Sequence, residues 1–492
     1  MSLALSLFVG EPRQALERAH AARGRASRVE LRLDRAPRLD FAALVRAMPL
    51  PVVAACPRRA EGGFFGGSGA EREARLLAAA EGGADFLDLP LGAKRPAGLP
   101  AATRVVHSWH EVPGERAGLE KRLHQLEERC RAGDVVKVVA WAETYSQSVR
   151  AFSLYERTRA PLIAFAQGPG GQASRAFAVV FGAPWIYVRD REQATAPGQW
   201  PLSELFALFP PGGAGPSTRL FGVVGNPVGR SRSPLLWNFA FRLRGIDAFY
   251  LALEPDRFED FLAAHGHPAF HGFSVTAPFK RAALQAAGEA DAAARRAGAA
   301  NTLQRTEAGW KAFNTDGPAA LDSLQDAGLS LPGRVLILGA GGAARGAAAE
   351  ALSRGFAVHL AARRAEAAEE LAAHLAEAKG PRTPALTAGG LSALNPEKFQ
   401  AIVNATPVGG DGVEGSLLAG RRLSSSTVAL DMVYSPPLTP LLREAREQEC
   451  RVVPGTRMLV KQMRRQFRIF TGEDVSEEAL ARAMRAEEAR PR

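Results

Sequence analysis

The feature that most limits the fold of this chain is a regular alternation along its first 200 residues. Short runs of β-branched and other apolar residues are separated by alanine-rich stretches with helical periodicity. This alternation is typical of parallel strands that are joined by crossover helices. We expect strands at residues 3–9, 28–34, 51–56, 84–89, 103–109, 134–140, 162–167 and 185–189. Eight such strands predict a (β/α)8 TIM barrel, in which functional groups lie at the carboxyl ends of the strands.

One of these strands contains a lysine. Lys137 is flanked by Val135, Val136, Val138 and Val139. Burying its amine is unfavourable unless the amine loses its charge or finds a partner, and burial alone can lower an amine pKa by roughly 3–5 units. A neutral buried amine can attack a carbonyl and form a Schiff base. The alternative is a structural lysine whose amine reaches solvent from the end of its strand.

Further polar residues stand where a barrel would carry its site. Glu30 and Arg32 are two apart and share one face of their strand, as either a structural ion pair or two site residues. His110 ends its strand and is either a core residue or a general acid and base. Donors after the last two strands suit an anionic, hydroxylated ligand; they are Arg175, Thr195 and Gln199.

In this order the motifs resemble those of type I 3-dehydroquinate dehydratase. They are Glu30-Leu-Arg32, Glu61-Gly-Gly, Ser-Trp-His110, the Lys137 strand, Ser174-Arg175 and Ala-Pro-Gly-Gln199. The resemblance implies that Lys137 forms an imine with the C3 ketone of 3-dehydroquinate. It implies that His110, held and polarised by Glu61, removes the C2 proton and then protonates the leaving C1 hydroxyl. Arg175 would clamp the substrate carboxylate, and the substrate hydroxyls would be held by Glu30, Arg32, Thr195 and Gln199.

One position departs from this family. The family usually has an arginine four residues before the glutamate of Glu-Gly-Gly, and this chain has Pro57 there. After a shift of one residue, Arg58 would replace that arginine, with Arg59 as the alternative. We take Arg58 as the expected substrate-binding residue.

A second set of polar residues follows residues 209–218. That segment is rich in proline and glycine and predicts a linker, with a long active-site loop as the alternative. Beyond it, each polar segment taken alone is typical of a turn or a helix cap. The residues in these segments that could bind a ligand are Ser231, Ser233, Thr276, Lys280, Asn301 and Asp316.

A strand, a glycine turn, a helix and a second strand follow one another over residues 334–361. This context favours a dinucleotide site, because the glycines let the backbone approach the pyrophosphate at a helix N-terminus. The second strand is followed by Arg363 and Arg364 in place of an acid, which favours the 2′-phosphate of NADP over NAD. The turn residues expected to contact the dinucleotide are Gly339, Ala340, Gly341, Gly342 and Ala343.

Residues 219–485 resemble shikimate dehydrogenase. The resemblance rests on Gly-Asn-Pro with Ser231 and Ser233, Val-Thr276-Ala-Pro-Phe-Lys280, Asn301-Thr, Asn-Thr-Asp316-Gly, Gly-Ala-Gly-Gly-Ala, Asn404-Ala-Thr-Pro, Asp431-Met-Val-Tyr434 and Met458-Leu-Val-Lys-Gln462. It implies that Lys280 and Asp316 form the proton-transfer pair while NADPH delivers hydride. The residues implied to bind substrate are Ser231 and Ser233 for the carboxylate and Thr276, Asn301, Tyr434 and Gln462 for the hydroxyls. Met432 and Gly455 would flank the nicotinamide.

Composition narrows the class of partner. The net charge of +11 comes from dispersed basic residues, so small anionic substrates explain it better than nucleic acid. Cys56, Cys130 and Cys450 lack metal-site spacing and favour a reducing compartment. We recognise neither a signal peptide nor a membrane span. We therefore expect a cytoplasmic enzyme with no metal, and the sequence is compatible with a homodimer.

Together the two resemblances predict a bifunctional enzyme that makes 3-dehydroshikimate and reduces it to shikimate. Both reactions would be steps in the biosynthesis of aromatic amino acids. We expect a barrel at 1–208, a linker at 209–218, a substrate-binding domain at 219–320 and a Rossmann NADP domain at 321–460. Residues 461–492 should form helices that pack back on the substrate domain. The rivals are a ligand-sensing regulator without turnover, an NAD enzyme of quinate or shikimate catabolism, and a chain in which only the dehydrogenase half is active.

Overall fold

The structure is a computed structural model. It describes residues 3–36, 39–115, 118–229, 231–377, 384–392 and 394–488. By its internal contacts the chain divides into a first unit, residues 1–221 with 233–270, and a second unit, residues 222–232 with 271–492. This division does not follow the boundaries expected from the sequence, which stay predictions.

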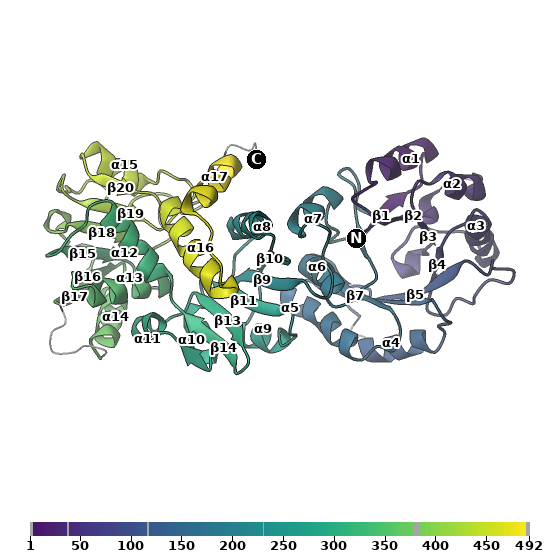
Figure 1. Ribbon diagram of the computed structural model, residues 1–492, viewed down its shortest axis with the longest axis horizontal. Coiled ribbons are helices and arrows are strands. Elements are labelled where there is room, and N and C mark those ends of the chain that lie inside the picture. The colour runs from purple at the N-terminus through teal and green to yellow at the C-terminus, as the bar shows by residue number, and fades with distance from the viewer. Residues whose placement is uncertain are drawn as a thin grey trace. The chain divides into compact units, whose positions relative to one another are not determined.

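The first unit contains an eight-stranded parallel sheet (Figure 1), in the order β7-β6-β5-β4-β3-β2-β1-β8. β1 pairs on one side with β2 and on the other with β8, so the last strand returns beside the first. Strands such as β6 are apolar on both faces because helices cover the outside and side chains fill the inside. The strands are β1(Leu3–Phe8), β2(Arg28–Arg32), β3(Val52–Ala55), β4(Phe86–Pro90), β5(Arg104–His110), β6(Val135–Trp141), β7(Leu162–Gln167) and β8(Ile186–Val188). The predicted (β/α)8 architecture is confirmed.

Helices connect most of these strands, and among the described residues no helix lies between β4 and β5. The helices are α1(Pro12–Ala21), α2(Phe41–Ala47), α3(Gly69–Glu81), α4(Leu119–Glu127), α5(Tyr145–Ser148), α6(Gln172–Val180) and α7(Leu202–Leu208). The N-terminus of α3 is fixed by a capping box, in which the Ser68 hydroxyl accepts from the Glu71 backbone N–H and the Glu71 carboxylate accepts from the Ser68 N–H. This cap fixes the start of a helix whose first turns lie beside the cavity described below.

The segment expected to be a linker is partly packed. Phe209 is buried, and its ring centroid lies 5.2 Å from that of Phe249. Phe177 of α6 lies 5.2 Å from Phe270 and 6.1 Å from Phe249 by the same measure. These aromatic contacts hold α6, the helix that carries Arg175, in place within the first unit.

A second sheet has six strands in the order β10-β9-β11-β13-β14-β12. β13 pairs antiparallel with both β11 and β14, so this sheet is mixed. The strands are β9(Arg219–Val224), β10(Ala248–Leu253), β11(Phe270–Val275), β12(Glu289–Ala290), β13(Thr302–Thr306) and β14(Gly309–Phe313). The helices in this stretch are α8(Ser233–Leu243), α9(Phe258–Ala264), α10(Lys280–Ala286), α11(Ala292–Ala297) and α12(Asp316–Asp326).

The third sheet, in the second unit, is parallel and has the order β17-β16-β15-β18-β19-β20. The chain leaves the central β15 toward β16 and later returns on its other side as β18, which is the crossover arrangement of a dinucleotide-binding fold. The strands are β15(Arg334–Leu338), β16(Ala357–Ala362), β17(Leu386–Gly390), β18(Ala401–Asn404), β19(Val428–Asp431) and β20(Arg451–Val453). The helices that follow them are α13(Gly342–Ser353), α14(Ala365–Glu377), α15(Pro440–Glu447), α16(Gly455–Thr471) and α17(Glu477–Glu488).

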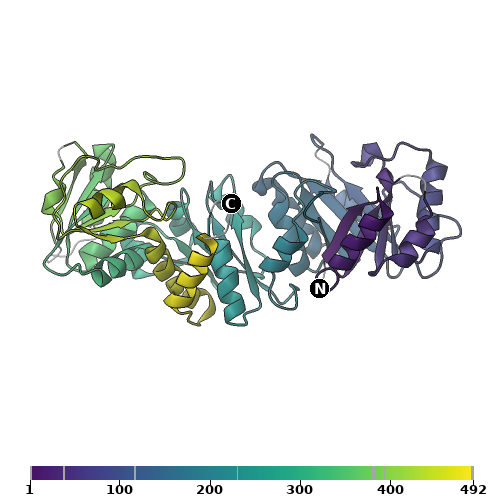
Figure 2. The same ribbon diagram turned by 90° about the horizontal axis from the view of Figure 1, so that it is seen from above.

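α16 and α17 lie side by side in both ribbon views (Figure 1 and Figure 2). α16 reaches back to strands β11 and β13. The Gln466 side chain donates to the Thr302 hydroxyl at 2.7 Å and accepts from the Ser274 hydroxyl at 3.0 Å. Residues 489–492 of the predicted C-terminal segment lie outside the described residues.

Candidate functional site

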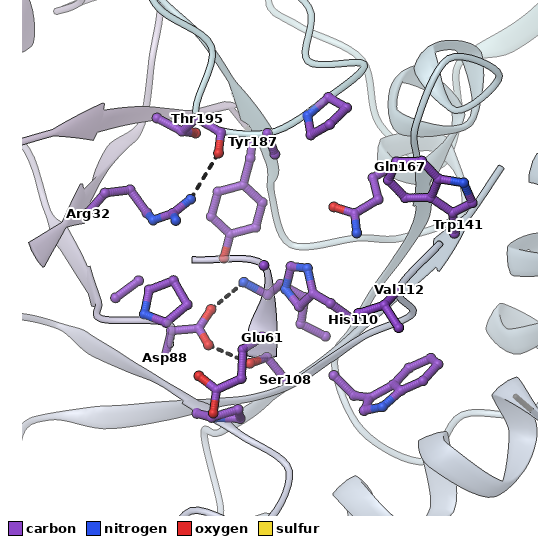
Figure 3. A pocket seen from close by; sticks show the side chains of 18 of the residues that line it. Arg32, Glu61, Asp88, Ser108, His110, Val112, Trp141, Gln167, Tyr187 and Thr195 are labelled. Atoms are coloured by element: carbon purple, nitrogen blue, oxygen red, sulfur yellow. Dashed lines mark hydrogen bonds and ion pairs between the residues drawn. The ribbon is translucent and has the colours of Figure 1, made fainter. Parts of the chain in front are cut away.

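A cavity of about 400 Å3 is lined by residues at or near the carboxyl ends of the strands of the first unit. This volume suits a small organic ligand. The predicted first-half residues that line it are Glu30, Arg32, Glu61, His110, Lys137, Arg175, Thr195 and Gln199. Figure 3 shows several of them converging from different strands and from the loops that follow strands, including Arg32, Glu61, His110 and Thr195.

Lys137 is buried in the wall of this cavity, with 4% of its surface exposed. Its Nζ forms an ion pair with the carboxylate of Asp88 on β4 and lies 4.7 Å from the ring centroid of Tyr187. Burial alone would lower the pKa of the amine, but the charge of Asp88, helped by Glu30, raises the pKa above its usual 10.5. The amine has therefore found a partner, and neither the solvent-reaching alternative nor a resting amine kept neutral by burial is correct.

Asp88 is a site residue that the sequence did not reveal. It accepts from Lys137 Nζ and, at 2.5 Å, from the Ser108 hydroxyl. Burial alone would raise the pKa of its carboxyl group, but Lys137 and Ser108 hold that pKa below its usual value. A signal existed: Asp88 lies inside an apolar strand, where an unpaired acid would be costly.

His110 ends β5 and keeps part of its surface open to the cavity. The surrounding protein desolvates the imidazolium, and the charge of Lys137 repels it, so the pKa of His110 falls to about 3. The imidazole is therefore neutral at ordinary pH and can accept a proton. Within the described part of the chain, no hydrogen bond joins His110 to Glu61, so the holding role of Glu61 stays a prediction.

Arg175 on α6 is buried in the cavity wall, with 1% of its surface exposed. Its Nη2 donates to the Pro197 carbonyl at 2.9 Å, and its guanidinium carbon lies 4.2 Å from the Phe165 ring centroid. Its Nε has no hydrogen-bond partner among the described residues. Burial lowers the pKa of Arg175 to about 9. A cation held in this way is prepared for an anionic group of a ligand.

The residues expected to bind hydroxyls form one hydrogen-bonded network. Arg32 makes a two-pronged contact with Asp34, at 2.9 and 2.8 Å, and donates to the Thr195 carbonyl at 3.0 Å. The Gln199 side chain accepts from the Thr195 backbone N–H at 2.9 Å. The Ser6 hydroxyl links the network further, since it donates to Glu30 and accepts from Thr195 at 2.6 Å.

Arg58 does not join this group. Its side chain is exposed and is not among the residues that line the cavity. The guanidinium lies instead at the start of α3, where Nη2 is 3.2 Å from the position that a Cβ would take on Gly69. The Arg58 backbone, in contrast, hydrogen-bonds within its loop, and its N–H donates to the Glu61 carboxylate at 2.8 Å. The expected substrate role of the Arg58 side chain is therefore not supported, and Arg59 is exposed as well.

The second unit contains a second lysine–aspartate pair. Lys280 is the first residue of α10 and Asp316 the first residue of α12, and Lys280 Nζ forms an ion pair with the Asp316 carboxylate. The Asn301 amide donates to the other oxygen of Asp316 at 2.8 Å and to the Thr315 hydroxyl at 2.8 Å. The structure thus brings three predicted residues into one buried hydrogen-bonded group.

This pair touches the predicted dinucleotide turn. A Cβ on Gly342 would lie 2.9 Å from both Cβ and Cδ of Lys280, so the stem of the lysine occupies the space that a side chain would need. Gly339 has φ +115°, which favours glycine, and a Cβ on Gly341 would meet open space. The turn lies between β15 and the N-terminus of α13, so its backbone N–H groups suit a pyrophosphate. These residues fit a dinucleotide.

The remaining predicted residues stand at the ends of elements. Thr276 follows β11, Ser233 begins α8, Arg363 and Arg364 are exposed after β16, and Gly455 begins α16. A Cβ on Gly455 would lie 2.3 Å from the Val433 carbonyl, so α16 starts close to the segment that holds Met432 and Tyr434. The roles of Ser231, Ser233, Thr276, Tyr434, Gln462, Met432 and Gly455 toward a ligand stay predictions.

Two absences apply to the described residues. None of the helices there is long and apolar enough to cross a membrane. The same part of the chain holds no group of three or more His, Cys, Asp or Glu residues that could bind a metal ion.

Known proteins resemble both halves of the chain. Residues 3–209 match the family described as "Type I 3-dehydroquinase", and residues 223–303 match "Shikimate dehydrogenase substrate binding domain". A crystal structure described as shikimate dehydrogenase in complex with NADP+ covers 56% of this chain and 98% of its own, with 29% identity and a TM-score of 0.52. "Shikimate dehydrogenase (NADP(+))" of Anaeromyxobacter sp. (strain Fw109-5) is 42% identical and covers 55% of this chain and 96% of its own length.

One relative spans both halves. "Bifunctional 3-dehydroquinate dehydratase/shikimate dehydrogenase, chloroplastic" of Arabidopsis thaliana is 32% identical over an alignment of 482 positions that covers 91% of this chain and 78% of that protein. The identity extends over the barrel, the dinucleotide fold and the segment between them. The chain therefore belongs to the family of bifunctional 3-dehydroquinate dehydratase/shikimate dehydrogenases.

Proposed function

We propose that this chain catalyses two consecutive reactions, the dehydration of 3-dehydroquinate to 3-dehydroshikimate and the NADPH-dependent reduction of that product to shikimate. The observation that carries the proposal is the pairing of two sites in one chain. One is a buried amine beside a neutral imidazole in a cavity whose wall includes Arg32 and Arg175. The other is a lysine–aspartate pair packed against a dinucleotide turn. The relative that spans both halves carries both activities in its name.

In the first site, Lys137 is the nucleophile. The amine rests protonated against Asp88, so it must release a proton before it attacks the C3 ketone, and Asp88 is the nearest acceptor. Attack gives a carbinolamine, which loses water to form the imine. The protonated imine draws electrons from the neighbouring C2–H bond, and the Asp88 carboxylate stabilises its positive charge.

His110 is placed to move the protons of the elimination. Because its pKa is about 3, the imidazole is uncharged in the resting site and accepts the C2 proton. The imidazolium then gives that proton to the departing C1 hydroxyl, which leaves as water. Hydrolysis of the remaining imine releases 3-dehydroshikimate and restores the amine.

Charged and polar side chains of the cavity wall hold the substrate for this chemistry. Arg175 binds the carboxylate through a guanidinium that the Phe165 ring and the Pro197 carbonyl already hold in place. The network of Glu30, Arg32, Thr195 and Gln199 binds ring hydroxyls. Since these groups are ordered before the substrate arrives, little reorganisation opposes binding.

In the second site, Lys280 and Asp316 share a proton next to the carbonyl that is reduced. The Asn301 amide fixes the orientation of Asp316, so Lys280 is held to give a proton to the carbonyl oxygen. NADPH, when bound, supplies the hydride. The turn at residues 339–343 would hold its pyrophosphate, Arg363 and Arg364 its 2′-phosphate, and Met432 and Gly455 would flank its nicotinamide.

The remaining polar residues would bind the ring that is reduced. Ser231 and Ser233 would hold its carboxylate. Its hydroxyls would be held by Thr276, Asn301, Tyr434 and Gln462.

Cytoplasmic location and a homodimer belong to this proposal as well. All three cysteines are free thiols, in keeping with a reducing compartment. The name of the Arabidopsis relative places that protein in the chloroplast.

The test is a coupled assay that starts from 3-dehydroquinate and NADPH with the full chain as the sole enzyme. We expect NADPH oxidation with shikimate as the product. If NADPH is consumed from 3-dehydroshikimate but not from 3-dehydroquinate, the dehydratase half of the proposal is wrong. If neither substrate leads to oxidation, both halves are wrong.

A further inference from the structure

The cavity of the first unit contains a third buried arginine besides Arg32 and Arg175, and none of the motifs identifies it. Arg72 lies in the first turn of α3, with 7% of its surface exposed, and it lines the cavity together with Glu61. Its Nη1 donates to Glu61 Oε1 at 3.3 Å, and its Nη2 lies 3.2 Å from Glu61 Oε2. A cation from a helix therefore reaches the site beside a residue of the expected catalytic set.

Most of the hydrogen-bonding capacity of Arg72 is unused. Among the described residues, Nε and Nη2 have no hydrogen-bond partner although both are buried, since the contact of Nη2 with Glu61 lacks hydrogen-bond geometry. Buried guanidinium N–H groups are normally satisfied because losing water without a replacement is unfavourable. Because both atoms are also out of reach of solvent, a ligand in the cavity accepts from them only after the guanidinium turns toward it.

The loop before Glu61 brings no side-chain cation of its own to the cavity, since Arg58 and Arg59 are exposed and do not line it. Pro57 occupies the position where the family usually has its arginine. The backbone of this loop is also fixed. The Arg58 carbonyl accepts from the Glu61 and Gly63 N–H groups at 2.9 and 2.8 Å, and the Pro57 carbonyl accepts from Phe65 N–H at 3.2 Å. A one-residue shift that would turn Arg58 inward must break these hydrogen bonds.

We propose that Arg72 replaces the missing arginine of the loop and contacts the substrate directly. It holds Glu61 through Nη1, and when substrate binds, its guanidinium turns so that the unpartnered N–H groups donate to a hydroxyl oxygen of the bound ring. Figure 3 shows Glu61 on the side of the cavity away from Arg32 and Thr195. Arg72 thus supplies a donor on a side of the ring that the other hydroxyl-binding residues do not cover. This inference rests on the proposed dehydration of 3-dehydroquinate.

The test compares Arg72→Met and Arg72→Lys with the matched controls Arg58→Met and Arg59→Met. Each variant is assayed for dehydration of 3-dehydroquinate and, on the same preparation, for NADP-dependent oxidation of shikimate, which reports folding of the chain. We expect Arg72→Met to raise the dehydratase KM by about 10- to 100-fold, as for the loss of hydrogen bonds from a charged donor. The shikimate oxidation rate should stay within about twofold, as should both activities of the controls.

A second variant tests whether the Arg72 guanidinium contacts the substrate or only packs within the protein. Arg72→Ala leaves room for a guanidinium ion, so added propylguanidinium should restore part of the dehydratase activity of this variant and leave Arg58→Ala unchanged. Arg72→Lys keeps the charge but loses the planar fork, and it should retain a raised KM.

Three results would overturn the inference: a wild-type dehydratase KM in Arg72→Lys, a loss in Arg58→Met equal to that in Arg72→Met, or no rescue of a folded Arg72→Ala. If instead the unmodified chain fails to dehydrate 3-dehydroquinate, the proposed function fails and not the assignment of Arg72 alone.

Discussion

The chain contains two buried lysine–aspartate pairs that are built in different ways. Lys137 and Asp88 project from the strands β6 and β4, whose backbones are fixed by their sheet. Lys280 and Asp316 are the first residues of two helices, α10 and α12. In the first pair the side chains are 5% and 9% exposed, and in the second 13% and 4%, so burial alone does not distinguish them.

The difference lies in what surrounds each pair. Lys137 faces a cavity that also holds an uncharged imidazole and the cations Arg32, Arg72 and Arg175, which suits covalent attachment of an anionic ketone. Lys280 has its stem against Gly342 and its partner held by Asn301, which suits proton transfer next to a dinucleotide. In the proposed function, the same two side chains serve different chemistry because their neighbours differ.

The largest effect should follow the loss of the first amine. Lys137→Met removes the nucleophile while keeping the length of the side chain, so dehydration should fall on the order of 10^5-fold. Shikimate oxidation should be unchanged. The two rates are measured on one preparation, and a parallel loss of both would mean that Lys137 acts through stability and not through chemistry.

Replacing the lysine of the second pair should have a smaller effect. Lys280→Met removes a proton donor but leaves the hydride chemistry to the cofactor, so the reduction of 3-dehydroshikimate should slow by about 10^2- to 10^4-fold. The dehydratase rate should not move. A reduction rate within tenfold of the original would show that the pair near Gly342 does not carry the proton.

A third change sharpens the account of the second site alone. Replacing Arg363 and Arg364 together by Ser should raise the KM for NADPH by about 10- to 100-fold, because two cations near the 2′-phosphate are lost. The KM for NADH should change little. An equal rise in the KM values for NADPH and NADH would show that these exposed arginines do not recognise the 2′-phosphate.

The smallest expected effect is that of pH on kcat/KM for dehydration. The pKa of Lys137 lies above 10.5, that of Asp88 below 3.8 and that of His110 near 3. None of these groups titrates between about pH 5 and 8, so kcat/KM for dehydration should be flat there. An acid limb centred near 6.5 in Lys137-dependent turnover would show that His110 titrates like an exposed histidine.

The lowered pKa of His110 also predicts how the free energy of unfolding changes with pH. The unfolded chain takes up a proton on His110 near pH 6.5, while the folded chain does so only near pH 3. The unfolding free energy should therefore fall as the pH drops below 6.5, by up to about 1.4 kcal/mol per pH unit from this residue. Denaturant titrations of the full chain and of His110→Asn at pH 7 and pH 5 should show a smaller drop in the variant.

Much of this organisation could be predicted from the sequence, because apolar periodicity and motif order carry it. The eight barrel strands and the turn at residues 339–343 follow directly from such patterns. Lys137 was found because an amine among valines is conspicuous. Lys280 and Asp316 were found through their motifs, 36 residues apart.

The partners of these residues could not be predicted, because they depend on register and on contacts across elements. Asp88 reaches Lys137 across the intervening β5, in which Ser108 pairs with Lys137. A sequence does not state that register. Arg72 belongs to a helix, and its approach to Glu61 depends on how α3 packs. Arg58 was expected from sequence proximity, and the hydrogen bonds of its loop keep its side chain outside.

The most direct test of the central claim is reductive trapping of the first reaction. The full chain is incubated with 3-dehydroquinate and sodium borohydride, and the modified residue is located by peptide mass spectrometry. We predict one covalent adduct, on Lys137, that forms equally in Lys280→Met and is absent from Lys137→Met. A folded chain that oxidises shikimate but gives no adduct, or gives one on another lysine, would contradict the imine mechanism.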